Sequence, residues 1–552
     1  MVALWTGLGA ASQQPPAEPP PAVALRVTTR LVLVDVVVTD KQGRPVTGLT
    51  RDDFALLESG KAQRISVFAF EAPETRATES QPPPPLPENV YTNRPAYRRT
   101  AGPPTILLLD LLNTAQRDQI FAREKMLDYL RTQLKPDQQY AIFALSTDLV
   151  LLQDFTSDPR LLQAALESFR TKKSTEISRG EPHQVPPEFP VPARVLERIE
   201  RINTANLVES IDSRVRTTLA ALRAIARAVD GIPGRKNLVW VSAAFPFTFT
   251  PANPNDSDLF RAYGPEIRRT TAQLADAQVA IYPVDARGLV GVPHDAAFDP
   301  RVTNPRQRAG LTIDEEELTN RVPFVVDSHQ AMEQLAVDTG GRAFLNRNDI
   351  AEAVALSQAD GSTYYTLGYY PESSAWDGRW HKLEVKLTKK GLQVRHRRGF
   401  YATDSLRAWQ DEPEKDELLR AALTDPLPPS AVTFLASVPP ATTASAAEVE
   451  IAFSIDVRTV AFETLEDGSR QASLDILAVA YSAGADPVAA SRTLGVRLPA
   501  EAYREAELRG LVFRLPLQLE SGDYELRLLV RDNRTGLTGR LDLPYTVRPA
   551  TP

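Results

Sequence analysis

Three aspartates lie at or near the ends of apolar runs, where a buried strand would deliver a carboxylate at its tip. Asp110 ends PTILLLD, Asp285 ends YPVD, and Asp154 lies within LQDFTSD. Such a carboxylate can bind a hard cation such as Mg²⁺, or it can order the next turn by accepting backbone N–H groups. Asp110 and Asp285 could face one rim of a sheet as an acidic pair, but the pattern favours turn capping at each position.

The residues after Asp110 point to capping. Asn113 followed by Gln116 is the pattern of a helix N-cap with its capping-box partner. Asp110 is then expected to accept backbone N–H bonds within the turn. A weak or altered metal site remains the alternative, in which Asn113 would supply an oxygen from a position shifted by one residue.

Other residue patterns that perform chemistry are missing. The chain has no cysteine, which excludes disulfides, thiolate metal sites and a cysteine nucleophile. Its histidines have no zinc-binding spacing, there is no Gly-x-Ser-x-Gly elbow, and GIPGRKN precedes a strand instead of following one as a phosphate loop does. We therefore predict no catalytic residue and no enzyme. A hydrolase whose site combines distant carboxylates, for example Asp110 with Asp285, is the competing hypothesis.

Composition and charge narrow the class of partner. A chain of 552 residues is too long for one core and predicts about three to four domains. The net charge of −7 argues against a nucleic-acid partner, and no apolar run reaches the ~18 residues of an integral membrane span. Residues 1–23 combine small residues with a Pro-rich tract, which predicts either the remnant of an export signal or a disordered tail. We expect a secreted, periplasmic or cell-envelope protein.

The elements that must position the aspartates follow from the hydrophobic period. Valine-rich runs with polar turns in 24–75, and clean alternation in 371–402, predict the two halves of one β-sandwich. Residues 76–99 are predicted to form a Pro-rich linker. A helix and linker are expected over 403–430, and about seven strand-like runs over 431–549 predict a C-terminal immunoglobulin-like β-sandwich.

Residues 100–370 alternate strands with helices, which is typical of a largely parallel sheet covered on both faces. The strands are predicted at 104–112, 138–147, 236–243, 278–285 and 362–370, and the helices near 115–134, 205–229, 257–277 and 328–339. The segments 171–204 and 287–325 are longer than ordinary connections, and we expect them to be lids, binding loops or disordered arms.

The order and spacing of several segments over 24–402 resemble the von Willebrand factor type A (VWA)-related proteins abundant in Acidobacteria. The matching segments include ILLLDLLNT, IPGRKNLVWVSAAFP, VAIYPVDARGL, LAVDTGGRAF and YYTLGYYP. The resemblance implies a Rossmann-like VWA domain inserted in an immunoglobulin-like sandwich. It also implies protein binding, often through a metal at the carboxyl end of the sheet, where open α/β sheets place ligands.

The metal motif of this family is only partly present. Asp110 matches the family's first aspartate and Thr114 can replace its second serine, but Leu112 stands where the first serine belongs. Ser242 replaces the aspartate after the fourth strand, and the loop threonine is Thr217 or Thr218. We therefore expect a degenerate metal site with the candidate ligands Asp110, Thr114, Thr217 and Ser242, beside a binding rim of Asn113, Asp154 and Asp285.

These patterns together predict an exported, non-enzymatic protein that binds another protein, with no cofactor or at most weakly bound Mg²⁺. A Mg²⁺-dependent adhesion domain with an altered metal site is the first alternative, and the carboxylate hydrolase is the second. The sequence does not identify the protein partner.

Overall fold

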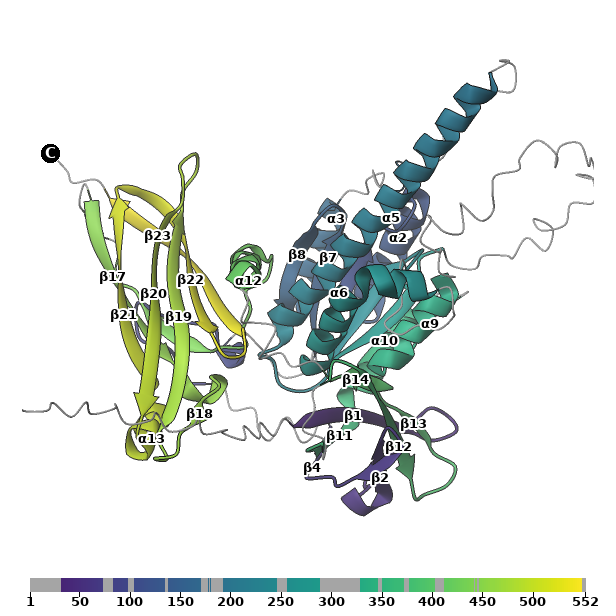
Figure 1. Cartoon of the computed structure of the whole chain (residues 1–552), viewed down its shortest axis with the longest axis horizontal. Coiled ribbons are helices and arrows are strands. Elements are labelled where there is room, and N and C mark those ends of the chain that lie inside the picture. The colour runs from purple at the N-terminus through teal and green to yellow at the C-terminus, as the bar shows by residue number, and fades with distance from the viewer. Residues whose placement is uncertain are drawn as a thin grey trace, which may run out of the picture.

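The computed structural model describes residues 31–72, 83–97, 104–134, 138–169, 177, 179, 192–245, 256–287, 328–345, 350–371, 377–402, 412–440, 442–443 and 446–548. These residues form a mixed α/β fold with several sheets, as predicted (Figure 1). The N-terminal segment 1–23 and most of the segments 171–204 and 287–325 lie outside the described residues. None of the described helices is long and apolar enough to cross a membrane.

A five-stranded sheet forms the centre of the α/β region, in the order β10-β9-β6-β7-β8. Its strands are β6 (Pro104–Asp110), β7 (Gln139–Leu145), β8 (Leu149–Thr156), β9 (Lys236–Ser242) and β10 (Val279–Asp285). The strands β10, β9, β6 and β7 run parallel, and β8 is antiparallel to β7. Every residue of the four parallel strands is buried, as covering on both faces requires.

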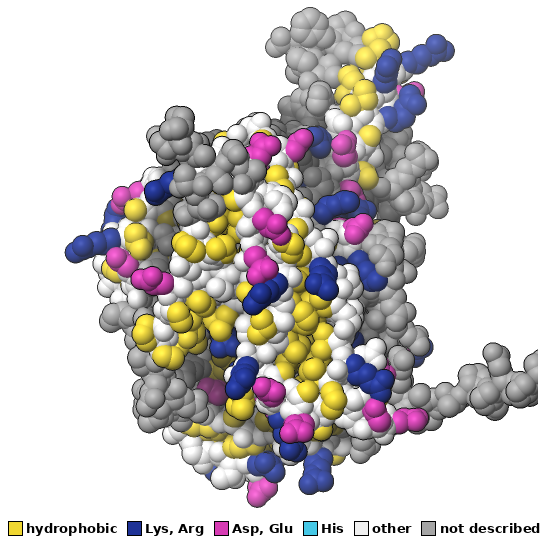
Figure 2. Space-filling model, turned by 90° about the vertical axis from the view of Figure 1, so that its left-hand side faces the viewer, with side chains coloured by type: hydrophobic (Ala, Val, Ile, Leu, Met, Phe, Trp, Pro, Cys, Tyr) yellow, Lys and Arg dark blue, Asp and Glu magenta, His cyan; other side chains and the backbone are white. Residues whose placement is uncertain are grey.

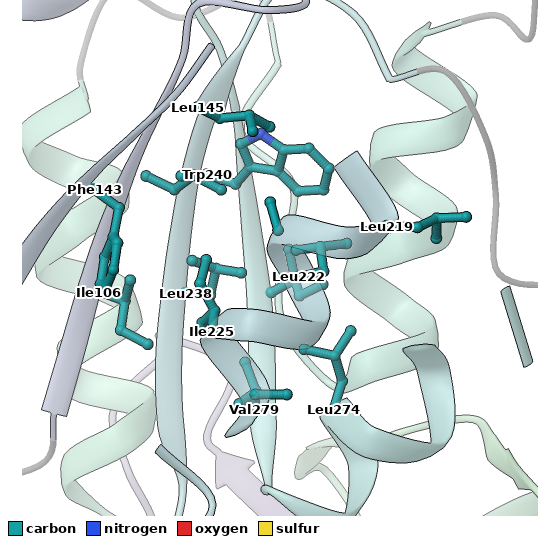
Figure 3. Packing of buried hydrophobic residues seen from close by; sticks show 14 of the residues in the cluster. Ile106, Phe143, Leu145, Leu219, Leu222, Ile225, Leu238, Trp240, Leu274 and Val279 are labelled. Carbon is teal, nitrogen blue, oxygen red and sulfur yellow. The ribbon is translucent and has the colours of Figure 1, made fainter. Parts of the chain in front are cut away.

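Helices cover both faces of this sheet. The helices are α2 (Gln116–Thr132), α3 (Pro159–Ser168), α5 (Ala193–Val229), α6 (Asp256–Asp276), α9 (Ser328–Thr339) and α10 (Ile350–Ser362). Residues of α5, α6 and α9 pack on one face, in a cluster that includes Ile106 and Trp240 of the sheet, Leu222 of α5 and Leu274 of α6 (Figure 3). Residues of α2, α3 and α10 pack on the other face.

Two predictions about this region were wrong. The run 362–370 forms β11 (Tyr364–Tyr369), which pairs with β1 and β4 and not with the α/β sheet. The fifth strand of the α/β sheet is β8 and not the run 362–370. A continuous apolar run indicates that a strand is buried, but it does not indicate which strands pair with it. The helix predicted from 205 begins at Ala193, inside the segment expected to be a loop.

The small β region comprises two four-stranded sheets, ordered β13-β1-β11-β4 and β14-β12-β2-β3. Its strands are β1 (Val32–Thr39), β2 (Phe54–Glu58), β3 (Lys61–Gln63), β4 (Val67–Glu71), β11, β12 (Trp380–Leu387), β13 (Gln393–Arg395) and β14 (Gly399–Tyr401), and η1 (Arg51–Asp53) precedes β2. Both sheets contribute to one hydrophobic cluster, for example through Val36 and Leu383. The second half of this region therefore begins at 364 and not at the predicted 371.

The C-terminal region contains a four-stranded sheet ordered β21-β17-β15-β5 and a second, six-stranded sheet. The second sheet runs β16-β23-β22-β19-β18, with β20 also paired to β19. The elements are β15 (Phe434–Ser437), β16 (Thr442–Thr443), β17 (Ala446–Ile455), η3 (Val457–Thr459), β18 (Glu463–Thr464), β19 (Arg470–Tyr481), β20 (Val488–Leu498), α13 (Ala500–Arg509), β21 (Leu511–Glu520), β22 (Gly522–Asp532) and β23 (Thr538–Arg548). One hydrophobic cluster draws on both sheets.

The outer strand of the four-stranded sheet in the C-terminal region is β5 (Val90–Thr92). It comes from the segment predicted to be a linker, and η2 (Pro95–Tyr97) follows it. The prediction of a plain linker over 76–99 was therefore wrong for these residues. Figure 2 views the C-terminal region from outside, where hydrophobic side chains lie among scattered charged ones. Val512 of β21 is among the exposed hydrophobic residues.

Helix α12 (Glu412–Thr424) and the residues after it connect the C-terminal region to the α/β region. Arg227 of α5 forms a two-bonded ion pair with Asp425, at 2.8 and 3.0 Å. Gly231 lies so close to Ser430 that a Cβ there would meet the Ser430 carbonyl oxygen at 1.8 Å. Because α5 is followed by the first residues of β9, this contact lies at the amino-terminal end of the parallel strands.

Candidate functional site

The carboxyl ends of the parallel strands form the candidate site. In chain order the sheet reads 3-2-1-4-5, so the winding direction reverses between β6 and β9. Asp285 is paired in register with Ser242, and Leu109 with Val241, which sets the last residues of β6, β9 and β10 in one row. Open α/β sheets bind ligands at such a reversal. The expected meeting of Asp110, Ser242 and Asp285 at one edge therefore occurs.

Asp110 is surrounded by hydrogen-bond donors. Its Oδ1 accepts the backbone N–H of Asn113 at 2.9 Å, as the capping interpretation expected. Its Oδ2 accepts from Asn113 Nδ2 at 2.9 Å, Ser242 Oγ at 2.8 Å and Trp240 Nε1 at 3.1 Å. Burial raises the pKa of Asp110 above its ordinary value, and these hydrogen bonds oppose that rise. The carboxylate thus ties the turn after β6 to β9.

Asn113 connects Asp110 to helix α5. Its Nδ2 also donates to Thr218 Oγ1 at 3.2 Å, and its Oδ1 accepts from Arg214 Nε at 2.8 Å. Thr218 is fully buried, whereas its neighbour Thr217 is half-buried. Of the two threonines considered from the sequence, Thr218 is therefore the one in contact with the switch point. Arg214 was not predicted, although it lies one helical turn before Thr218 and so shares its face.

The turn after β6 is closed by contacts other than the predicted helix cap. Helix α2 begins at Gln116 with Ala115 as N-cap and without a side-chain cap, so the capping box at Asn113 was a wrong prediction. Asn113 is instead committed to Asp110 and α5. Thr114 Oγ1 accepts the backbone N–H of Ala243 at 3.0 Å.

Asp285 has a charged environment that the sequence did not reveal. Arg287 donates Nε to Oδ1 and Nη2 to Oδ2, both at 2.9 Å, and His329 Nε2 lies 2.7 Å from Oδ2. Burial would raise the pKa of Asp285, but the bonds from Arg287 and His329 outweigh it and hold the pKa below its ordinary value. His329 belongs to the first turn of α9, so this cluster connects the end of β10 to the start of α9.

Asp154 does not belong to the rim. Strand β8 returns antiparallel from a short turn, with Leu145 opposite Leu149 and Tyr140 opposite Thr156. Asp154 consequently lies toward the amino-terminal edge of the sheet, where it is exposed. The sequence interpretation placed it at the rim because it predicted no strand over 149–156, and so it did not show that this segment runs back from the rim.

A divalent cation does not fit the predicted ligands. Leu112 is buried in the hydrophobic cluster on the α5 face, and Thr114 Oγ1 accepts a backbone N–H. Both oxygens of Asp110 already accept donors, and Ser242 Oγ donates to one of them. Mg²⁺ requires several oxygens free to converge on it. Within the described ranges, no group of three or more His, Asp or Glu side chains could hold a metal ion.

The chain matches no protein-family model and no curated protein. Solved structures with some likeness include an aerotolerance-related membrane protein from Bacteroides fragilis, at 12% identity and TM-score 0.24 over 47% of this chain and 98% of that chain. BatB from Bacteroides thetaiotaomicron has 15% identity and TM-score 0.19 over 47% and 97%. A von Willebrand factor type A protein from Catenulispora acidiphila has 8% identity and TM-score 0.22 over 90% and 74%. Scores this low assign no family to the chain.

Proposed function

We propose that this protein is an exported, non-enzymatic protein-binding module that uses the carboxyl edge of its α/β sheet without a metal ion. The observation that carries the proposal is the row formed by Asp110, Ser242 and Asp285 at the switch point, whose oxygens are bound by protein donors. A rim ordered in this way is a rigid base for the loops that leave it. The export part of the proposal depends on the composition of 1–23, where small residues precede a Pro-rich tract.

We also propose that the α/β region is a VWA-like domain of the kind found in Acidobacteria. In this proposal the small β region is the immunoglobulin-like sandwich into which it is inserted, and the C-terminal sheets form a second sandwich. The return of the chain from β4 to β11 across the α/β region supports the insertion, because β11 pairs directly with β1 and β4.

The surroundings of the two rim aspartates argue against a carboxylate hydrolase. A catalytic acid or base needs a proton to exchange with substrate. Asp110 is 2% exposed and accepts four donors, and Asp285 is held between Arg287 and His329. The space beside Asp110, lined also by Gln119 and Phe169, encloses about 240 Å³ including open solvent, which is below the usual size of a ligand pocket.

Metal titration tests the first part of the proposal. Calorimetry of the full chain with millimolar Mg²⁺ or Mn²⁺ should give no binding heat, and Asp110→Ala should give the same result. Saturable binding that is lost in Asp110→Ala would instead support the Mg²⁺-dependent adhesion domain.

Site-specific photo-crosslinking tests the binding surface. Thr147 is exposed in the turn between β7 and β8 at the rim, and Asp154 is exposed near the other end of the same β8 strand. A photoreactive residue at 147, in cells that export the protein, should give a discrete adduct that 154 does not give. Equal labelling at both positions, or none at 147, would contradict a rim-directed partner.

A further inference from the structure

Residues 89–94 lie between the small β region and the α/β region in the chain, but they are bound to the C-terminal region. Thr92, Tyr91 and Val90 pair with the three β15 residues from Leu435 to Ser437. The Val438 N–H donates to the Asn89 carbonyl at 3.0 Å, which extends the antiparallel contact by one residue. β5 is thus the outer strand of a sheet whose other strands all come after residue 430.

Buried side chains fix this strand. Asn93 is fully buried; its Nδ2 donates to the Val432 carbonyl at 2.8 Å and its Oδ1 accepts the Phe434 N–H at 2.9 Å. Thr92 Oγ1 donates to the Phe434 carbonyl at 2.7 Å. The side-chain amide of Asn93 thus satisfies one backbone acceptor and one backbone donor, as a partner strand would. Loss of this amide would leave the Val432 carbonyl and the Phe434 N–H without these partners.

The backbone of two neighbouring segments packs closely around Asn93. A Cβ at Gly539 of β23 would meet the Val432 carbonyl oxygen at 1.7 Å and Asn93 Nδ2 at 2.6 Å. Glycine at 539 therefore lets three segments, 93, 432 and 539, come together at one point. Arg94 adds an ion pair to Asp456 at 3.3 Å, between partly buried side chains.

We infer that the β15 edge is a strand-acceptor site whose ligand is an extended peptide carrying Thr-Asn at the two buried positions, supplied by residues 89–94 of the same chain. The C-terminal region keeps its fold only while this strand is in place. Together with the Arg227–Asp425 contact, the strand attaches the C-terminal region to the rest at two separate points. That region is not an independent tail, and removal of 403–552 would also leave 89–94 without its partner strand.

Hydrogen exchange of the full chain tests this inference, with Asn93→Ala compared against Tyr91→Ala. Tyr91 lies in β5, two residues before Asn93, and is more than a third exposed, so it is the matched control. Asn93→Ala should speed amide exchange about tenfold or more throughout β15, β17 and β23, while β6 and β9 keep the wild-type rate. Tyr91→Ala should leave all five strands near wild type. Faster exchange confined to 89–94, or equal effects of the two variants, would overturn the inference.

A disulfide provides a second test that does not depend on Asn93→Ala folding. The chain has no cysteine, so Tyr91→Cys with Ala436→Cys introduces one pair of thiols, at positions that face each other in the sheet. Oxidation should give a monomer on denaturing gels and should raise the temperature at which the C-terminal region unfolds. A bond between two chains would show that the ligand comes from a second copy, and an unchanged unfolding temperature would show that the strand is dispensable. Either result would refute the inference.

Discussion

The two edges of the α/β sheet handle buried charge in different ways. At the carboxyl edge, Asp110 is a single carboxylate whose donors are the neutral groups of Asn113, Ser242 and Trp240. At the amino edge, Arg235 is a buried cation among the carboxylates of the small β region and α10. The first arrangement orders a turn within one domain, whereas the second joins two regions of the chain.

At the amino edge, Arg235 makes specific hydrogen bonds to both regions of the chain. Arg235 Nη2 donates to the Gly340 carbonyl at 2.6 Å and to Tyr282 Oη at 3.0 Å, and its backbone N–H donates to Tyr364 Oη of β11 at 2.9 Å. Burial lowers the pKa of Arg235, but Tyr282, Asp35 and Asp360 together outweigh it, so the pKa lies above its ordinary value. The guanidinium therefore stays charged, while the backbone N–H of the same residue connects β11 to the α/β sheet.

Other charged contacts cross the same boundary. Gln278 Nε2, in the turn before β10, donates to both oxygens of Asp35 in β1 at 3.0 Å, and Arg395 of β13 forms an ion pair with Asp360 of α10. Residues at this edge are thus engaged by the chain's own β region. The comparison teaches that the amino edge is used for assembly within the chain, which agrees with the proposal that the carboxyl edge binds a partner.

The largest expected effect is at the amino edge. Arg235→Met should lower the free energy of unfolding by about 3–5 kcal/mol, because it leaves Asp35 and Asp360 buried with less compensating charge. Urea denaturation at pH 7 measures this loss. Arg179→Met, on an exposed ion pair with Glu209, is the control and should change stability by less than about 1 kcal/mol. A loss at 235 no larger than the control's would remove the distinction between the edges.

A smaller effect is expected at the rim. Asp285→Asn should cost about 1–3 kcal/mol at pH 7, because Arg287 and His329 lose their charged acceptor. Since the folded-state pKa of Asp285 is lowered, its contribution is present above the unfolded value of roughly 4 and is lost as the pH falls below it. Denaturation curves from pH 2.5 to 7 should therefore converge with wild type in acid. Parallel curves would contradict the assigned charge state.

Asp110→Asn should give a pH dependence of the opposite sign. Because the folded-state pKa of Asp110 is raised, its contribution is complete below the unfolded value of roughly 4 and falls as the pH rises through the folded value. The stability of wild type minus that of the variant should thus decrease with pH, whereas the corresponding difference for Asp285 increases. The same denaturation series measures both, and equal signs would show that the two rim carboxylates share one environment.

The smallest effect separates two adjacent threonines. Thr218→Val removes a buried acceptor from Asn113 and should cost about 1 kcal/mol, while Thr217→Val should cost less than about 0.5 kcal/mol. Thermal unfolding of the two variants side by side measures the difference. A larger loss of stability in Thr217→Val than in Thr218→Val would contradict the assignment of the Asn113 contact to Thr218.

Much of the α/β region could be predicted from local pattern. The apolar runs that end at Asp110, Ser242 and Asp285 were recognised as buried strands, and alternation with helices placed their carboxyl ends on one edge. The chemistry of residue 112 could also be read from the sequence, because a leucine cannot coordinate a metal ion under any fold. Arg214, Trp240 and Arg287 were missed, since nothing in their spacing shows which distant side chain each one contacts.

The sequence by itself determined which side chains can carry charge and located most strands and helices of the α/β region. It predicted a linker where β5 lies and a loop where α5 begins. Tertiary structure decided where β5 and β11 pair, which end of the sheet holds Asp154, and which donors surround each rim aspartate. The physical reason is that burial leaves a hydrophobic period along a single segment, whereas strand direction, register and hydrogen-bond partners depend on residues hundreds of positions away.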